Sequence, residues 1–240
     1  KADAIWMALK KGFFKDEGLD VTVKWFSAGT TAMQTFQSGK EGKRGFGDFN
    51  TGGELPAVNF WQNMDEQYTL FAIIERDTEG YVGVAKAAIK TGKDLKGKII
   101  ATRVGSTGSW FVSEYLKAHG LTEKDVTIKN MDPHIMPSAL DRGDIDAFFI
   151  WEPYGAQALK ISGPRVHKLT TAKGFMNGYL VIGTWKWYLK EHPGVAERML
   201  RAMDKGRRYA AENKGEVIQF AKDQIRSNIN TVSAFGPSEV

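Results

Sequence analysis

The chain from residue 96 to residue 110 reads Lys96-Gly97-Lys98-Ile99-Ile100-Ala101-Thr102-Arg103-Val104-Gly105-Ser106-Thr107-Gly108-Ser109-Trp110. Its first half is a short apolar run rich in β-branched residues after a glycine, which predicts a strand over 98–102. Apolar residues then recur at helical spacing from Trp110 to Leu116, and Gly120 is a natural end for that helix. The order is therefore strand, small-residue turn, helix.

Such a turn exposes backbone N–H groups at the positive end of a helix dipole, with serine and threonine hydroxyls beside them. An anion is the ligand that this arrangement suits best. A helix cap at Ser106 or Thr107 explains the same residues without any ligand. Taken alone, the turn leaves both interpretations open.

The composition limits the domain organisation and the classes of function that the chain can have. The chain has 240 residues, 42% of them hydrophobic and 25% charged, which fits one large globular domain or two smaller lobes. The net charge of +5 favours anionic partners weakly, but lysine and arginine are scattered, so we expect no nucleic-acid binding. The absence of cysteine excludes disulfides, thiolate nucleophiles and cysteine-ligated metals. No apolar run approaches the roughly 20 residues of a membrane helix, and no signal peptide is visible.

Short apolar segments alternate with helical patterns along the chain. We expect strands at 19–25, 46–49, 69–75, 81–85, 98–102, 126–128, 146–150, 166–169 and 179–183. This alternation predicts an α/β fold with mostly parallel sheets. The continuous apolar run 69–75 is typical of a strand covered on both faces. Segments 32–49 and 138–148 resemble each other, with about six extra residues around Lys40–Arg44 in the first copy. They indicate either two similar lobes or a chance similarity between two helix–strand units.

Two further small-residue turns are expected at 27–31 and 50–54. In addition, Trp151-Glu152-Pro153 follows the predicted strand 146–150 at its carboxyl end, where open α/β sheets bind ligands. Glu152 could accept hydrogen bonds from an ammonium or hydroxyl group, or serve only as a cap or an ion-pair partner between lobes. Trp110 and Trp151 could be walls of a pocket or core residues.

Signatures of several enzyme classes are missing. The sequence contains no GxGxxG, no GxxxxGK[ST], no GxSxG and no HExxH. The residues at Asp141, Asp144 and Asp146 lack the further oxygen ligands that a calcium loop needs. We therefore expect no catalytic residues, no metal and no cofactor.

Five segments, at 11–21, 94–98, 105–107, 139–147 and 151–154, resemble periplasmic solute-binding proteins of the aliphatic sulfonate, taurine and nitrate type, with the NMT1/THI5-like group as close kin. The resemblance implies a two-lobed α/β periplasmic binding protein fold of type II, the Venus flytrap. Lobe one would comprise residues 1–82 and 178–240 and lobe two residues 83–177, with crossings near 80–85 and 175–179 and the ligand cleft between the lobes. The family's usual first strand is missing ahead of the first helix, so we expect the chain to be incomplete.

The same resemblance implies a binding site and a function. Carried onto this chain, the ligand-binding residues are Ser27, Gly29, Asn50, Thr51, Gly52, Gly105, Ser106, Thr107, Trp110, Trp151 and Glu152. The expected function is the extracytoplasmic substrate-binding component of an ABC importer. It would deliver a small anionic or zwitterionic solute (an aliphatic sulfonate, taurine or a nitrate-like ion) to a membrane permease.

We expect a monomer that is periplasmic, or extracellular and membrane-anchored, with its N-terminal targeting segment not present in this chain. The alternative is an enzyme or a binder of thiamine-pyrimidine precursors on the same scaffold. The enzymes known on this scaffold depend on cysteine, which is absent here, so the resemblance favours binding without catalysis.

Overall fold

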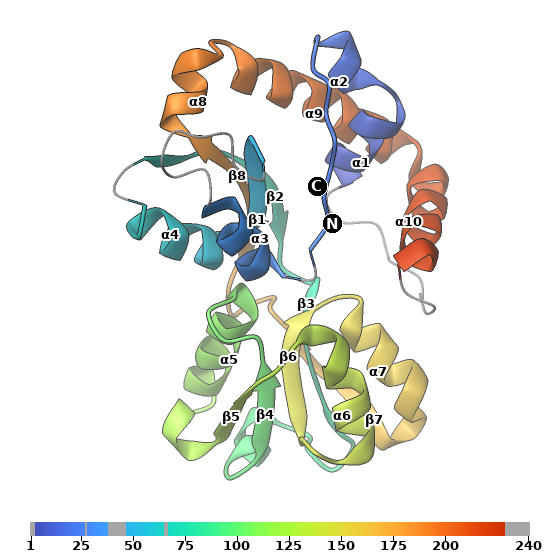
Figure 1. Cartoon of the computed structure of the whole chain (residues 1–240). Helices are drawn as coiled ribbons and strands as arrows, with labels where there is room; N and C mark the ends of the chain where they lie inside the picture. The colour runs from blue at the N-terminus through green and yellow to red at the C-terminus, as the bar shows by residue number, and fades with distance from the viewer. Residues whose placement is uncertain (1–2, 27, 38–46, 65–66, 229–240) are drawn as a thin grey trace.

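The computed structural model describes residues 3–26, 28–37, 47–64 and 67–228. Its strands form two sheets. The order in the three-stranded sheet is β1 (Phe49–Gly53), β8 (Gly178–Trp185), β2 (Tyr68–Asp77), and the order in the five-stranded sheet is β5 (Thr127–Asn130), β4 (Ile99–Thr102), β6 (Ala147–Trp151), β3 (Tyr81–Lys86), β7 (Val166–Thr171). Figure 1 shows the two sheets one above the other, each with its own helices. The two copies of the expected helix–strand repeat lie in different sheets, α3 (Gly29–Phe36) with β1 and α6 (Met136–Arg142) with β6. The extra residues around Lys40–Arg44 lie outside the described residues.

The smaller sheet consists of β1 (Phe49–Gly53), β2 (Tyr68–Asp77) and β8 (Gly178–Trp185), paired antiparallel. Around it lie α1 (Asp3–Lys10), α2 (Phe13–Asp16), α3 (Gly29–Phe36), α4 (Glu54–Gln62), α8 (Lys186–Glu191), α9 (Val195–Glu212) and α10 (Lys214–Asn228). Aromatic rings fill its core: Phe36 stacks on Trp185 with ring centroids 5.0 Å apart, and Phe60 meets Tyr68 edge to face. These contacts hold α3 and α4 against the sheet.

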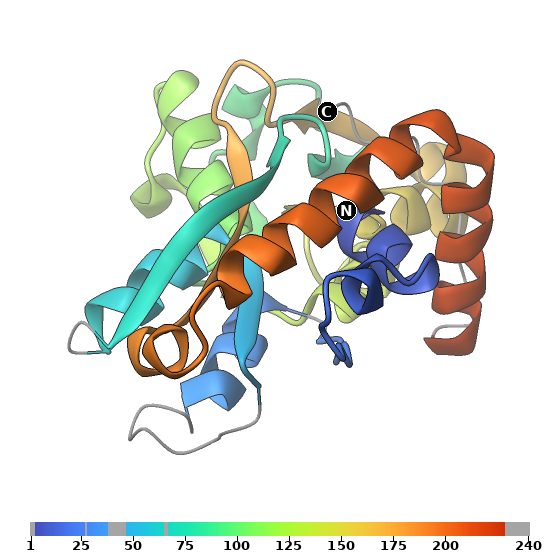
Figure 2. The ribbon, with the colours of Figure 1, turned by 90° about the horizontal axis from the view of Figure 1, so that it is seen from above.

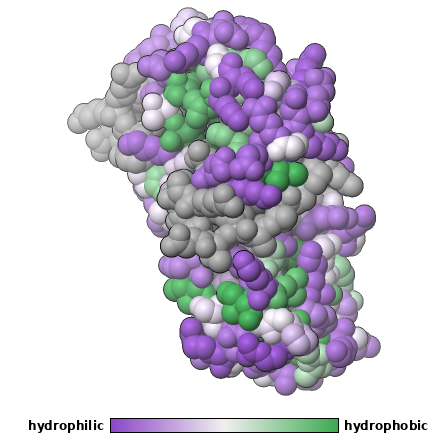
Figure 3. All heavy atoms as spheres, turned by 90° about the vertical axis from the view of Figure 1, so that its right-hand side faces the viewer, coloured by the Kyte–Doolittle hydropathy of each residue, from purple (hydrophilic) through white to green (hydrophobic). Residues whose placement is uncertain are grey.

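The long helix α9 crosses over the smaller sheet and packs on α1 (Figure 2). The two helices approach closely at Gly206, where a Cβ atom would lie 2.1 Å from the Ala4 carbonyl oxygen. Only glycine fits at that crossing. No helix of the described residues is long and apolar enough to cross a membrane. The side face shown in Figure 3 is mainly hydrophilic where it is described, with apolar residues in smaller groups.

The larger sheet consists of β3 (Tyr81–Lys86), β4 (Ile99–Thr102), β5 (Thr127–Asn130), β6 (Ala147–Trp151) and β7 (Val166–Thr171). Its helices are α5 (Thr107–Ala118), α6 (Met136–Arg142) and α7 (Tyr154–Ser162). Phe111 and Tyr115 of α5 pack on Phe149 of β6, while Met136 and Leu140 of α6 belong to a second apolar cluster with Phe148. Neighbouring residues of β6 thus serve opposite faces, as a strand with both faces covered requires.

The expected parallel pairing is found in the core β5-β4-β6 of the larger sheet, while β3 and β7 join it antiparallel. The prediction for 69–75 was wrong about its environment. This segment belongs to β2 at the edge of the antiparallel sheet, and Ile73 is 65% exposed. The apolar run reflects contacts of alternate residues such as Ala72 and Ile74 with the helical layer, not burial of both faces.

Two other local predictions need correction. Residues 19–24 alternate half-buried and exposed as expected, and Leu19, Val21 and Val23 pack against the cluster of Phe14 and Met199. Trp25 is exposed, however, and segment 19–25 is not a strand. Apolar alternation reports burial of one face and does not by itself supply a hydrogen-bonded partner strand. Conversely, residues 50–53 are not a turn: they continue β1, because they pair with residues 180–183 of β8.

The chain passes between the sheets twice, from Asp77 of β2 to Tyr81 of β3 and from Thr171 of β7 to Gly178 of β8. In the first passage the Asp77 carboxylate accepts a hydrogen bond from the Gly80 amide at 2.6 Å. Arg76 Nη2, near the end of β2, donates to Asn177 Oδ1 at 2.8 Å and so links β2 to the second passage. Both passages lie close to the predicted lobe limits at 82/83 and 177/178, although β3 as a whole belongs to the larger sheet.

Candidate functional site

The turn between β4 and α5 is closed by its own hydrogen bonds. Gly105 has φ +79°, a left-handed conformation that glycine adopts without strain. The Ser106 amide and hydroxyl both donate to the Arg103 carbonyl oxygen, at 3.1 and 2.6 Å. Ser106 precedes the first residue of α5, yet its side chain makes no capping hydrogen bond to the helix. The hydroxyl-cap interpretation therefore fails for Ser106, which is 2% exposed.

This geometry leaves the first amides of α5 available. The Ser109 and Trp110 amides donate to the Ser106 carbonyl oxygen. Within the described part of the chain, no acceptor is hydrogen-bonded to the amides of Thr107 or Gly108. Unpaired N–H groups at the start of a 12-residue helix carry the positive end of its dipole and favour a negatively charged group.

Three of the predicted small-residue segments meet in front of this helix. A Cβ atom at Gly29 would lie 3.5 Å from the Gly52 Cα atom, and one at Gly53 would lie 2.7 Å from Thr107 Oγ1. Gly29 begins α3 and Gly52 lies in β1, whereas Thr107 begins α5 beside the larger sheet. The contact therefore joins the elements of one sheet to those of the other, as the predicted clamp requires.

The other predicted residues of β1 are Asn50 and Thr51. Asn50 is 6% exposed, and its Oδ1 atom has no hydrogen-bond partner among the described residues. Thr51 is half-buried and pairs with Ile182 of β8. Ser27 lies outside the described residues.

Sequence reasoning missed two residues at this junction, Glu54 and Tyr81. Burial raises the pKa of the Tyr81 phenol, the Glu54 carboxylate raises it further, and the neighbouring Thr107 hydroxyl lowers it. The phenol is therefore neutral at physiological pH. The carboxylate of Glu54 accepts a hydrogen bond from the Tyr179 amide at 2.9 Å. From the sequence, Glu54 looks like an acidic residue favoured in the first turn of a helix, and only the fold brings it near Tyr81.

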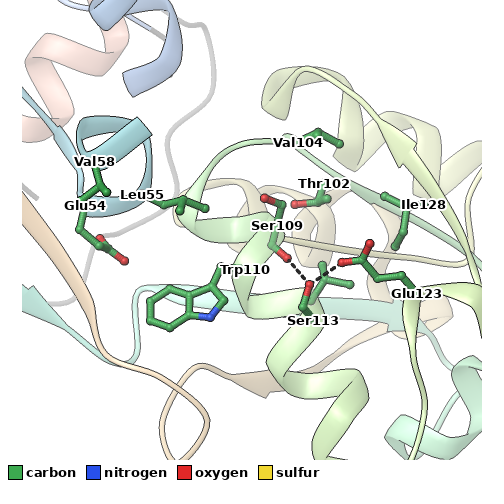
Figure 4. A pocket seen from close by; sticks show the side chains of 11 residues that line it. Glu54, Leu55, Val58, Thr102, Val104, Ser109, Trp110, Ser113, Glu123 and Ile128 are labelled. Carbon is green, nitrogen blue, oxygen red and sulfur yellow. Dashed lines mark hydrogen bonds between the residues drawn. The ribbon is translucent and has the colours of Figure 1, made fainter. Parts of the chain in front are cut away.

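A hollow of about 480 Å³ opens between α4 and α5 (Figure 4). It is lined by Glu54, Leu55, Val58, Thr102, Val104, Ser109, Trp110, Val112, Ser113, Glu123 and Ile128. Trp110, one of the predicted site residues, is 38% exposed and forms part of this wall. Glu123 accepts a hydrogen bond from the Ser113 hydroxyl. Among the residues that the structure describes, the lining of this hollow contains two carboxylates and no lysine, arginine or histidine.

Trp151 and Glu152 do not line the hollow. Trp151, the last residue of β6, packs against the apolar clusters on both faces of the larger sheet. The Glu152 carboxylate accepts a hydrogen bond from the Ala156 amide at 2.9 Å, and its Oε1 atom lies 3.8 Å from Lys168 Nζ. Lys168 belongs to β7 of the same sheet, so this ion pair does not link the lobes. The geometry favours the structural alternative for both residues, and their contact with a ligand stays a prediction.

Comparison with known proteins agrees with this architecture. The NMT1/THI5-like family model matches residues 60–217, and the chain belongs to that family. The fold is that of the periplasmic binding proteins. The alkanesulfonate-binding protein of Xanthomonas axonopodis pv. citri, solved with bound MOPS, superposes on this chain with a TM-score of 0.77. The two sequences are 19% identical, and the match covers 91% of this chain and 74% of that one. The predicted fold is thus confirmed.

Curated relatives point in the same direction. A putative aliphatic sulfonates-binding protein of Bacillus subtilis is 28% identical over 225 residues, which is 90% of this chain and 65% of that protein. The taurine-binding periplasmic protein of Escherichia coli is 28% identical over 205 residues, 83% of this chain and 60% of that protein. The chain therefore spans a little under two thirds of the length of these relatives.

Proposed function

We propose that this chain is the substrate-binding part of an ABC import system and clamps a small anionic or zwitterionic solute between two lobes. Lobe one comprises residues 1–82 and 178–240, and lobe two residues 83–177. The proposal rests above all on one observation: Gly53, which lies against Gly29, contacts Thr107 at the start of α5. There, elements of both sheets meet at a helix terminus whose first amides favour an anion.

The mechanism is a shift between open and closed arrangements of the lobes. The two passages at 78–80 and 172–177 serve as the hinge, because they are the places where the chain leaves one sheet for the other. A ligand that contacts both lobes only when they are closed stabilises the closed form by its differential affinity. A membrane permease then recognises that form. This places the protein outside the cytoplasmic membrane, in the periplasm or anchored at the cell surface.

We propose binding without chemical conversion. The chain has no cysteine, and the residues around Thr107 that the structure describes offer a neutral phenol and a carboxylate that accepts a backbone hydrogen bond. The enzymes known on this scaffold depend on cysteine, so its absence from this chain supports the proposal.

A thermal-shift screen tests this proposal. Taurine, ethanesulfonate and nitrate are compared with a neutral aminopyrimidine, because a ligand that binds only the folded state raises the melting temperature by mass action. We expect the sulfonates to raise it. A rise with the neutral pyrimidine and none with the anions would contradict the proposal and favour a precursor-binding protein.

A further inference from the structure

We infer that Tyr81 is a positioning residue of the proposed clamp. Its ring, packed against Gly178 beside both passages, sets the angle between the lobes and so brings Thr107 against Gly53. This inference rests on the proposed function and adds the residue that couples the hinge to the start of α5.

The Tyr81 ring lies at the hinge. Tyr81 is the first residue of β3, directly after the first passage, and Gly178 is the first residue of β8, directly after the second (Figure 1). A Cβ atom at Gly178 would lie 3.0 Å from Tyr81 Cδ2 and closer still to Cε2. Gly178 does not have a positive φ, so glycine is needed there to make room for the ring and not for its backbone conformation.

The rest of Tyr81 is fixed within the larger sheet. The residue pairs with Trp151 of β6, and its carbonyl oxygen accepts a hydrogen bond from the Ala172 amide at 3.0 Å. Tyr81 is 7% exposed and belongs to the apolar cluster of Phe111 and Phe149. The ring is therefore a fixed part of the larger sheet that reaches the first residue of β8 in the smaller one.

A short path leads from Gly178 to the candidate site. The next residue, Tyr179, donates its amide to the Glu54 carboxylate at 2.9 Å. Glu54 directly follows Gly53, which contacts Thr107. Each step is one covalent neighbour or one close contact, and packed contacts of this kind carry a displacement from one site to another.

The surroundings of the Tyr81 phenol agree with this path. Burial raises the pKa of the phenol most, the Glu54 carboxylate raises it further, and the Thr107 hydroxyl lowers it, so both groups lie near the phenol. Loss of the ring would leave a void at the hinge, and the lobes would then adopt a wider range of angles.

Distances between spin labels on the two lobes test the inference without a ligand. The chain has no cysteine of its own, so Gln62→Cys at the end of α4 and Lys117→Cys in the last turn of α5 provide the two labelling sites, both exposed. Double electron–electron resonance measures the distance distribution between them. We expect Tyr81→Leu to broaden this distribution and Tyr81→Phe, which keeps the ring, to leave it unchanged.

The matched control is Tyr154→Leu. Tyr154 of α7 is 6% exposed and belongs to the second apolar cluster of the larger sheet. Its loss should lower the free energy of unfolding, as the loss of Tyr81 does, but should not change the distance distribution. Urea unfolding of each variant checks that it folds.

Gly178→Ala approaches the same contact from the other lobe. The added methyl group meets the Tyr81 ring, so we expect a shifted distance distribution. In a Tyr81→Leu background the same substitution should have little effect, because the clashing ring is gone. Equal shifts in the two backgrounds would show that the ring and Gly178 do not act together.

Titration with ethanesulfonate links the hinge to binding. If Tyr81→Leu leaves about a tenth of the molecules in the competent arrangement, the apparent affinity falls about tenfold. Tyr81→Phe and Tyr154→Leu should keep the affinity of the unsubstituted chain.

Three outcomes separate the possible failures. Identical distance distributions for Tyr81→Leu and Tyr154→Leu would overturn the inference. Weaker binding by Tyr81→Leu with unchanged distances would also overturn it, because Tyr81 would then act on the ligand directly. Failure of the unsubstituted chain to bind ethanesulfonate would contradict the proposed function, whereas the distances measured without ligand would still decide the role of Tyr81.

Discussion

Gly53 and Thr107 touch across the junction of the two sheets, so closely that a Cβ atom at Gly53 would lie 2.7 Å from Thr107 Oγ1. Gly53 ends β1 of the smaller sheet and Thr107 begins α5 beside the larger one. The Gly53 backbone has φ −60° and ψ 152°, which any residue can adopt. Glycine is needed at this position for the contact with Thr107 and not for its backbone conformation.

The Gly53→Ala variant should therefore oppose closure. Overpacking of a tight contact costs about 1–3 kcal/mol. Here it destabilises the closed arrangement, in which the two lobes touch. In the presence of ligand, we expect the variant to show a larger radius of gyration than the wild-type chain by small-angle X-ray scattering. We also expect it to bind sulfonate about tenfold more weakly, or worse.

The matched control is Gly47→Ala, because a Cβ atom at Gly47 would lie 3.6 Å from its nearest neighbour, an ordinary contact. Adding Thr107→Ala to Gly53→Ala removes the clashing oxygen and should restore the compact form. Unchanged scattering and affinity in Gly53→Ala would show that the junction does not limit closure.

Thr107 and Ser106 should respond differently to loss of the hydroxyl. Thr107→Val keeps the shape of the side chain, and we expect it to weaken sulfonate binding by about 1–3 kcal/mol, the value of a hydrogen bond to a charged group. Ser106→Ala removes the bond to the Arg103 carbonyl oxygen and should lower the free energy of unfolding by about 1 kcal/mol. Titration calorimetry and urea unfolding separate the two effects. A larger loss of affinity in Ser106→Ala than in Thr107→Val would reverse this assignment.

Asp146 should make stability depend on acid pH. Burial alone would raise the pKa of this carboxyl, but hydrogen bonds from the Ile99 amide at 2.9 Å and Lys86 Nζ at 2.7 Å outweigh it, so the pKa lies below the ordinary 3.8. A lowered carboxyl pKa stabilises the folded state above 3.8, and the contribution disappears as the pH falls from 3.8 through the folded value.

Urea unfolding of the wild-type chain and of Asp146→Asn measures this contribution. The difference in unfolding free energy should be constant from pH 7 to about pH 5 and shrink below the ordinary pKa of 3.8. A difference that grows on acidification would have the wrong sign for a carboxyl whose pKa is lowered in the folded state.

Local patterns in the sequence predicted most elements of the larger sheet. The segment 98–120 folds as expected, because a β-branched run, a left-handed glycine and a helix ending before Gly120 all indicate the same structure. Segment 50–53 was assigned wrongly because its glycines indicate a turn locally, whereas antiparallel pairing with β8, far along the chain, makes it a strand.

The candidate site was predicted only in part, for a similar reason. Thr107, Gly29 and Gly52 were identified from small-residue turns, and the fold brings them together. Glu54 and Tyr81 were missed, because each has an ordinary local role and acquires its position from contacts between the two sheets. Glu152 was predicted from its place at a strand end, but its carboxylate is engaged by the Ala156 amide, a partner that the sequence does not reveal.

Native mass spectrometry of the chain incubated with ethanesulfonate tests the central claim most directly. Binding between the lobes without conversion predicts a one-to-one complex that releases the ligand with unchanged mass, and the Thr107→Val chain should show less of that complex. Absence of any complex, or release of a ligand with altered mass, would contradict the account.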